Sequence, residues 1–240
     1  SDPKVIADSD ALILPGVGAF GDAMNYLKEN FLVEPLLNFA KTGKPFLGIC
    51  LGMQLLFTES EEFGNHKGLN LIEGKILRFP QKNKNGEINR IPQISWNQIF
   101  LNSTVTWNKS PLKDLEDGDY MYFVHSYYAE PTKLNSILSF TDFGGIRYAS
   151  STIYENIIGM QFHPEKSGTH GLKVYKRWMD LIKKTINMGE KEEAKYGLPT
   201  EVKFCSKCVM SNQRPTSTQE FKHNISSKKQ TMAFDKQGVC

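Results

Sequence analysis

The segment 48–52, Gly-Ile-Cys-Leu-Gly, constrains the fold of this chain more than any other stretch. It lies between a short apolar run at 45–47 and a helix-like stretch at 53–57. A strand that turns sharply into a helix around one side chain needs small flanking residues, because bulk there would collide with the neighbouring backbone. We therefore interpret Cys50 as the nucleophile of such an elbow, at a helix start that favours the thiolate. The alternative is a buried core cysteine between incidental glycines.

The order of apolar segments predicts an α/β fold. A continuous apolar run at 11–14 is typical of a strand in a parallel sheet and ends in a glycine-rich loop at 15–18, and apolar residues recur at helical spacing over 22–37. With the elbow, this order favours a mostly parallel sheet flanked by helices. Short alternating runs from residue 72 onward predict a smaller antiparallel portion.

A second motif, Gln-Phe-His-Pro-Glu at 161–165, provides a partner for the cysteine. In an extended segment side chains alternate, so His163 and Glu165 are expected to point to the same side. The imidazole then takes the proton of Cys50, while the carboxylate orients the ring. A histidine alone is more often structural, but the combination with the elbow predicts a Cys-His-Glu triad.

Composition excludes several classes of protein. The chain has 240 residues and a formal net charge of +3, which is too small to indicate nucleic acid as a partner. It contains no apolar stretch long enough to span a membrane. Its four cysteines form no disulfide framework, which indicates a reducing cytoplasm. The acidic patch at 59–62 is expected to be a solvated surface.

Four motifs make the chain resemble the class I (triad) glutamine amidotransferases, and among them the glutaminase subunits of imidazole glycerol phosphate synthase. The resemblance covers residues 11 to about 185. The matching motifs are Pro-Gly-Val-Gly at 15–18, Gly-Ile-Cys-Leu-Gly-Met-Gln at 48–54, Phe-Val-His-Ser-Tyr at 123–127 and Gln-Phe-His-Pro-Glu-Lys-Ser at 161–167.

The resemblance implies a reaction and a set of roles. Cys50 attacks the side-chain amide of glutamine, His163 protonates the leaving ammonia and later activates water, and Glu165 orients His163. The N–H of Leu51 and one from the 15–18 loop stabilise the oxyanion. The substrate-binding residues implied in this way are Gly16, Val17, Gly18, Leu51, Gln54, Ser126 and Tyr127.

The same resemblance implies a partner protein. The family passes ammonia to a (β/α)₈-barrel synthase subunit, so contact residues are expected at Trp96, Asn97, Tyr122 and Lys166, with Trp96 and Asn97 on an exposed loop. Relatives usually have histidine and glycine before the Trp-Asn pair, whereas this chain has Gln93 and Ser95. A partner different from that of the relatives, or a different signal across the interface, is therefore an alternative.

Both ends of the chain depart from the family. The resemblance begins after the family's first strand and helix, so we expect a fragment that is poorly stable alone. We assign 1–185 to the glutaminase domain, 186–202 to a linker and 203–240 to a partial zinc-ribbon-like segment. The predicted zinc ligands are Cys205, Cys208 and Cys240, with His223 a weaker candidate.

Three alternatives stay open at this point. The C-terminal segment resembles the opening of acetamido-sugar amidotransferases, which suggests ammonia supply for sugar amidation in surface-polysaccharide synthesis. A non-catalytic zinc-binding adaptor with a relic triad is the second alternative. The third is a cysteine peptidase on a similar scaffold. The residues implied to bind a free amino acid argue against it.

Overall fold

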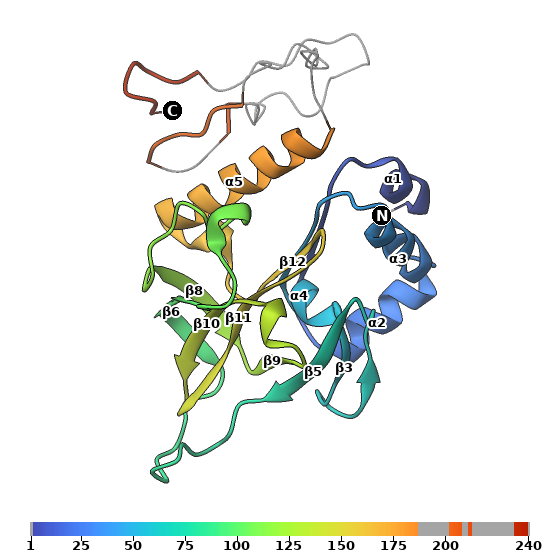
Figure 1. Cartoon of the computed structure of the whole chain (residues 1–240), viewed down its shortest axis with the longest axis vertical. Coiled ribbons are helices and arrows are strands. Elements are labelled where there is room, and N and C mark those ends of the chain that lie inside the picture. Colours follow the sequence, from blue (N-terminus) through green and yellow to red (C-terminus); the bar gives the residue numbers. More distant parts are fainter. Residues whose placement is uncertain (1, 187–201, 208–210, 213–232, 240) are drawn as a thin grey trace, which may run out of the picture. The chain divides into compact units, whose positions relative to one another are not determined.

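The computed structural model describes residues 2–186, 202–207, 211–212 and 233–239 of the chain. The chain divides into two compact units, residues 1–187 and 188–240. The first unit is an α/β domain built on a ten-stranded mixed sheet and a separate two-stranded sheet (Figure 1). No helix among the described residues is both long and apolar enough to cross a membrane.

Three parallel strands form the part of the sheet that carries the elbow. They are β1 (Leu12–Gly16), β2 (Phe46–Cys50) and β12 (Ile157–Met160), with β2 in the middle and wholly buried. Alternate side chains of β2 enter different cores: Phe46 packs with residues of α1, α2 and α3, whereas Leu47 packs with residues of α5. This alternation explains why the run is apolar throughout. These helices are α1 (Pro3–Asp8), α2 (Phe20–Glu29), α3 (Val33–Lys41) and α5 (Gly168–Ile186).

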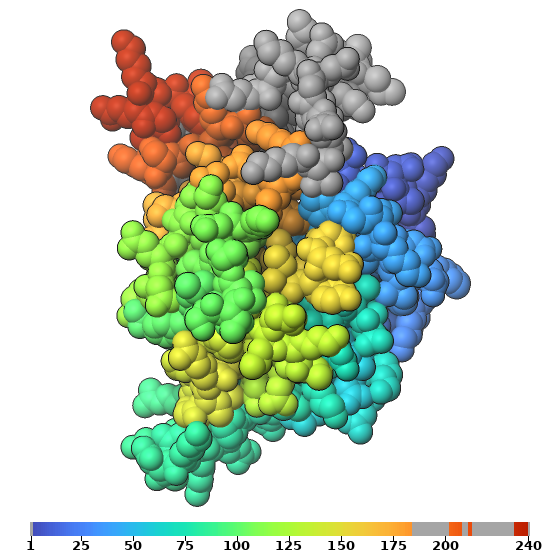
Figure 2. Space-filling model, in the orientation of Figure 1, coloured from blue at the N-terminus to red at the C-terminus, as the bar shows by residue number. Residues whose placement is uncertain are grey.

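The rest of the sheet is largely antiparallel, as the short alternating runs predicted. Its order continues from β12 through β11, β9, β5 and β3 to β4, and β10 pairs with β11 and β7. The hairpin at 80–90 projects from the lower end of the view (Figures 1 and 2). The strands are β3 (Phe57–Ser60), β4 (His66–Lys67), β5 (Ile72–Arg78), β7 (Phe100–Leu101), β9 (Tyr127–Pro131), β10 (Ile137–Phe143) and β11 (Ile146–Tyr154).

A two-stranded antiparallel sheet lies outside the main one. It pairs β6 (Gln93–Gln98) with β8 (Tyr120–His125), so the segment around Trp96 is a strand and the prediction of a loop was wrong. β8 and β9 are separated at Ser126, where the aromatic run of the sequence changes from one sheet to the other. Single 3₁₀ turns occur at Trp107–Lys109, Leu134–Ser136 and Pro164–Lys166.

Two helical predictions need correction. The apolar periodicity over 22–37 belongs to two helices, α2 and α3, because the chain turns between them at Phe31, which has a φ of 56°. The helix after the elbow is α4 (Leu51–Leu55), which begins two residues before the predicted 53–57 stretch, and Phe57 already belongs to β3. Both errors arise because apolar spacing alone does not locate a break in the backbone.

The two ends of the chain leave some predictions untested. β1 ends the sheet order, and β2 is its only strand partner among the described residues. The predicted missing strand and helix, and the low stability of the chain alone, stay predictions. In the second unit, Cys205 is buried and Ser206 N–H donates to Gly238 O at 2.9 Å. Cys208, Cys240, His223 and the predicted linker lie wholly or mostly outside the described residues.

Candidate active site

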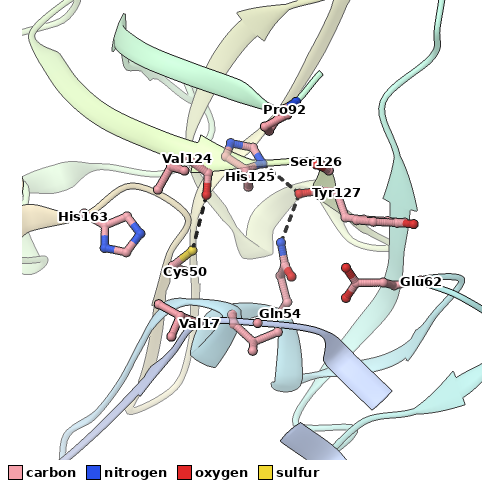
Figure 3. A pocket seen from close by; sticks show the side chains of 12 residues that line it. Val17, Cys50, Gln54, Glu62, Pro92, Val124, His125, Ser126, Tyr127 and His163 are labelled. Carbon is pink, nitrogen blue, oxygen red and sulfur yellow. Dashed lines mark hydrogen bonds between the residues drawn. The ribbon is translucent and has the colours of Figure 1, made fainter. Parts of the chain in front are cut away.

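One cavity of about 300 Å³ contains most of the predicted site residues (Figure 3). It opens at the carboxyl end of β2, where Cys50 is the last residue of the strand. The predicted residues that line it are Val17, Gly18, Cys50, Leu51, Gln54, Ser126, Tyr127 and His163. The residues that line it without having been predicted are Glu62, Pro92, Val124 and His125.

The backbone at Cys50 has the strained conformation expected of a nucleophile elbow. Its φ of 53° and ψ of −113° are unusual for a residue with a side chain, and it directly precedes α4. A Cβ added at Gly52 would lie 1.7 Å from Leu14 O, and one at Gly48 would lie 2.8 Å from Gly52 O. The two glycines are therefore required by the close approach of backbone to backbone.

His163 and Glu165 form a directly bonded pair beside the cysteine. His163 Nδ1 is 2.6 Å from Glu165 Oε1, and the Tyr175 hydroxyl donates to Glu165 Oε2 at 3.4 Å. His163 Nε2 is buried and has no hydrogen-bond partner among the described residues, and Figure 3 shows the imidazole beside the Cys50 sulfur. The pairing was predicted, but its geometry was not, because Glu165 lies in a 3₁₀ turn and not in an extended segment.

The charges of this pair follow from their surroundings. The interaction with the nearby Cys50 side chain, and next the hydrogen bond with Glu165, raise the pKa of His163 to about 9. Burial raises the pKa of Glu165, but the hydrogen bond with His163 and the charge of its ring outweigh this and lower that pKa. At neutral pH the site therefore holds an imidazolium at position 163, beside the Cys50 sulfur and the Glu165 carboxylate.

The backbone of His163 is held by β8. His163 N–H donates to Tyr122 O at 2.9 Å. Ser167 Oγ accepts from Tyr122 N–H at 3.0 Å and donates to His163 O at 2.7 Å. The two-stranded sheet therefore positions the imidazole that faces the cysteine.

The loop between β1 and α2 lies against the start of α4. A Cβ added at Gly16 would lie 3.0 Å from Leu51 Cβ, and Gly18 has a φ of 98°. Gly16 does not line the cavity, whereas Val17 and Gly18 do. The far end of the loop is held by Glu62, whose Oε2 accepts from Phe20 N–H at 2.6 Å.

Glu62 corrects the prediction that the 59–62 patch is a solvated surface. Glu59 fits that prediction, since it makes surface ion pairs with Lys67 and Lys75. Glu62 instead lines the cavity and is the only carboxylate among its described lining residues. No spacing signal in the sequence separates the two glutamates, because the turn after β3 decides which one faces inward.

Gln54 lies in the floor of the cavity in a network of buried polar groups. Its Nε2 donates to Tyr127 O at 3.0 Å and to Gln161 Oε1 at 3.0 Å. His125 Nδ1 lies 2.8 Å from the same Tyr127 O, and its Nε2 lies 3.2 Å from the Tyr148 hydroxyl. Burial lowers the pKa of His125 to about 4, so this histidine stays neutral and structural. Neither His125 nor Gln161 had been predicted as a site residue.

The predicted partner-contact residues lie outside the cavity. Trp96 and Tyr122 stack edge-on with centroids 6.1 Å apart, and Lys166 Nζ lies 5.8 Å above the Tyr122 ring. Trp96 is 51% exposed. We call these three side chains the Trp96 cluster. Asn97 is half-buried and its Nδ2 donates to Asp142 O at 2.9 Å, so it belongs to the sheet beside the cluster.

Comparisons with known proteins agree with this geometry. A family model described as "Glutamine amidotransferase class-I" matches residues 2–182. The imidazole glycerol phosphate synthase subunit HisH of Syntrophotalea carbinolica is 44% identical over 182 residues, which cover 75% of this chain and 85% of the relative. The same subunit of Wolinella succinogenes is 46% identical over 181 residues, with the same coverage of 75% and 85%.

Solved structures show a similar fold. The crystal structure of a glutamine amidotransferase has a TM-score of 0.54 at 16% identity, covering 75% of this chain and 82% of that chain. PurLQS from Thermotoga maritima has a TM-score of 0.53 at 20% identity, covering 73% and 81%. At these identities the similarity concerns the fold, which agrees with the predicted α/β architecture.

Proposed function

This chain belongs to the class I glutamine amidotransferases, and on that premise we propose that it hydrolyses L-glutamine to glutamate and ammonia through Cys50, His163 and Glu165. The observation that carries the proposal is the strained elbow cysteine in one cavity with an imidazole that Glu165 holds from its other side. A nucleophile, a base and an orienting carboxylate are the parts that acyl transfer through a thioester requires.

The residues support the following sequence of steps. The Cys50 thiolate attacks the carboxamide carbon of glutamine, and the carbonyl oxygen becomes an oxyanion. When the C–N bond breaks, the His163 imidazolium gives its proton to the leaving ammonia. Neutral His163 then takes a proton from the water that attacks the thioester, and glutamate leaves as the thiolate is restored.

The oxyanion is assigned to backbone donors. We propose that two groups donate hydrogen bonds to the oxyanion: the Leu51 N–H and an N–H of the Gly16–Val17–Gly18 loop. Support comes from the contact between Gly16 and Leu51 and from the place of Val17 and Gly18 in the cavity wall. Removing one such donor typically costs about 3–4 kcal/mol of activation free energy.

The substrate's polar ends need complementary groups. Free glutamine carries an α-ammonium group, for which the carboxylate of Glu62 is the matching partner in the cavity. Gln54 directs its N–H groups to Tyr127 O and Gln161, which leaves its carbonyl oxygen as a further acceptor. The backbone at Ser126 and Tyr127, which also lines the cavity, is assigned to the α-carboxylate.

We further propose that the ammonia passes to a (β/α)₈-barrel synthase subunit, as in histidine biosynthesis. The names of the relatives support this assignment. The Trp96 cluster is the proposed contact surface, since it joins exposed aromatic and basic side chains to the strand that holds His163. The chain departs from its relatives at Gln93 and Ser95. Gln93 is fully buried and accepts from the Tyr148 hydroxyl at 3.0 Å, so its side chain lies on the inner side of the two-stranded sheet.

The test is glutamate release from glutamine, measured with and without a barrel synthase subunit. The wild-type chain is expected to release glutamate, faster with the partner, and Cys50→Ala is expected to abolish release while its circular dichroism spectrum stays unchanged. Release by Cys50→Ala at the wild-type rate, or none by the wild-type chain with any partner, would overturn the proposal.

The predictions about the C-terminal segment and the location of the protein have less support than the glutaminase activity. A zinc ion held by Cys205, Cys208 and Cys240 is not tested, because two of these three residues lie outside the described part of the chain. The relatives named above give no support for a sugar amidotransferase as the ammonia acceptor. A cytoplasmic location likewise stays a prediction.

A further inference from the structure

A chain of hydrogen bonds runs through buried side chains from a backbone carbonyl to the sulfur of Cys50. Gln54 Nε2 donates to Tyr127 O at 3.0 Å and to Gln161 Oε1 at 3.0 Å. Gln161 Nε2 then lies 3.8 Å from Cys50 Sγ. Gln161 is fully buried and Gln54 is 5% exposed, so little water competes for these bonds.

The backbone carbonyl sets the direction of every bond in this chain. Tyr127 O can only accept, so the atom of Gln54 that faces it is the amide nitrogen. That nitrogen also faces Gln161 and donates there, so the atom of Gln161 that receives the bond is its carbonyl oxygen. The remaining end of Gln161 is the NH₂ group, which faces the sulfur as a donor.

A second donor removes the ambiguity at the carbonyl. His125 Nδ1 lies 2.8 Å from Tyr127 O and must carry its proton there, whichever form the rest of the ring takes. Tyr127 O therefore accepts two bonds, and a flipped Gln54 amide would place oxygen against oxygen. The orientation of Gln161 follows from the network and does not depend on how one amide was assigned.

We infer that Gln161 stabilises the thiolate of Cys50 by donating an N–H to its sulfur, and that its bond to Gln54 ties the nucleophile to the glutamine-binding floor. The inference deepens the proposed function and rests on it for its role in turnover. Cys50 Sγ lies 3.9 Å from Val124 O, to which a thiol can donate, and this leaves a sulfur lone pair for Gln161. Once the proton has gone, the buried Gln161 amide is a neutral donor to the anion.

The competing explanation is that Gln161 is a core polar residue that merely satisfies Gln54. Glutamate at this position perturbs the contact selectively, because Gln161→Glu keeps the oxygen that Gln54 needs and replaces the NH₂ group by a second oxygen. Only the contact with sulfur changes in kind. A new carboxylate would also repel a thiolate, so the deciding variant is Gln161→Met, which adds no charge: a core role predicts no change at its thiol, whereas a donor role predicts a less reactive one.

The experiment measures how fast iodoacetamide alkylates Cys50 in the full chain, with the Cys50 peptide followed by mass spectrometry from about pH 6 to about pH 9. Gln161→Glu is expected to slow alkylation about tenfold near neutral pH and to move the reaction profile to higher pH, since hydrogen bonds to charged groups are of this strength. The matched control is Gln98→Glu, because Gln98 Nε2 also donates to a backbone carbonyl, Gly118 O at 3.0 Å.

A second variant protects the test against misfolding. Gln161→Met removes donor and acceptor together at similar volume, and it is expected to slow alkylation in the same direction. An unchanged alkylation profile in folded Gln161→Met, or equal slowing in Gln98→Glu, would overturn the inference.

The alkylation needs no turnover of glutamine, so it fails separately from the proposed function. A chain that lacks glutaminase activity but shows the Gln161-dependent profile refutes the proposed function and supports the contact. An active glutaminase with a Gln161-independent profile does the reverse.

Discussion

His163 lies between two groups that both favour its charged form. Cys50 raises its pKa most and Glu165 next, and the carboxylate is itself kept ionised by the imidazole. In the proposed reaction, this arrangement holds the proton that the leaving ammonia takes up. Three predictions follow from individual side chains in and beside this site.

The first concerns the carboxylate that orients the ring. Glu165→Gln removes the negative charge 2.6 Å from Nδ1, so the pKa of His163 is expected to fall from about 9 toward its ordinary 6.5. The rate constant kcat for glutamate release is expected to drop about 100-fold or more. NMR titration of the imidazole and steady-state kinetics measure the two effects. Glu59→Gln, which alters only a surface ion pair, is the control; equal loss there would contradict the role given to Glu165.

The second concerns stability and pH. Since the folded pKa of His163 is about 9 and the ordinary value is 6.5, the stability due to its charged form is complete below pH 6.5 and is lost as pH rises through about 9. His163→Asn is therefore expected to destabilise the fold more at pH 6 than at pH 10. Urea unfolding of both proteins at the two pH values tests this. A constant or reversed difference would show that the charged ring does not stabilise the folded state.

The third concerns recognition of the α-ammonium group. Glu62→Gln keeps an oxygen for Phe20 N–H but removes the charge, so KM for glutamine is expected to rise about tenfold or more, with a smaller effect on kcat. Glu61→Gln is the matched control. Glu61 also accepts a backbone bond, from Arg78 N–H at 2.7 Å, but does not line the cavity. An unchanged KM in Glu62→Gln would remove this residue from the binding site.

The turn from β2 into α4 leaves little room for side chains. Three backbone segments meet there: the end of β2, the start of α4 and the last residues of β1. Gly52 lies where they meet, and the space that a side chain would need is already taken by a carbonyl of β1.

Gly52→Ala is therefore expected to destabilise the fold by about 3 kcal/mol or more, because a Cβ would lie 1.7 Å from Leu14 O and backbone does not yield cheaply. The control is Gly43→Ala, whose φ of 75° costs about 1–2 kcal/mol but whose Cβ meets no neighbouring atom within 4 Å. Equilibrium unfolding in urea compares them. A smaller loss for Gly52→Ala than for Gly43→Ala would refute the steric explanation of the elbow.

Elements also show where inference from sequence fails. The strand-loop-helix order from β1 to α2 was predicted correctly, because each of these segments has its own local signal, whereas the short helix α1 before it was not predicted. The break at Phe31, the change of sheet at Ser126 and the 3₁₀ turn at Glu165 were not. Each of these depends on what the segment packs against, and a single segment of sequence carries little of that information.

At the scale of the molecule, the two-stranded sheet connects an exposed surface to His163, the proposed catalytic histidine. The outer face of β6 and β8 carries the Trp96 cluster, while the backbone of Tyr122 holds His163. A partner that binds Trp96 would therefore contact the sheet whose strand β8 positions the imidazole.

Trp96→Ala is expected to weaken binding of a barrel synthase subunit by about 30-fold or more, because a half-exposed indole at the centre of such a surface is a typical hot spot. Isothermal titration calorimetry measures the affinity. Phe31→Ala, which removes a phenyl ring that is 82% exposed, is the matched control and is expected to bind as the wild type does. Equal affinities of all three proteins would exclude the cluster as the contact surface.

The elbow glycines, the cysteine and the His-Pro-Glu motif could be identified from sequence because their requirements are local: a tight turn needs glycine, and a triad needs certain side chains. Folding in three dimensions was needed to bring Glu62 to the cavity and to place the Gln161 amide against the Cys50 sulfur. Those contacts join strands and turns far apart along the chain, and their existence depends on sheet order and packing. No local pattern specifies sheet order, so the donors around the nucleophile became visible only when the sheet was assembled.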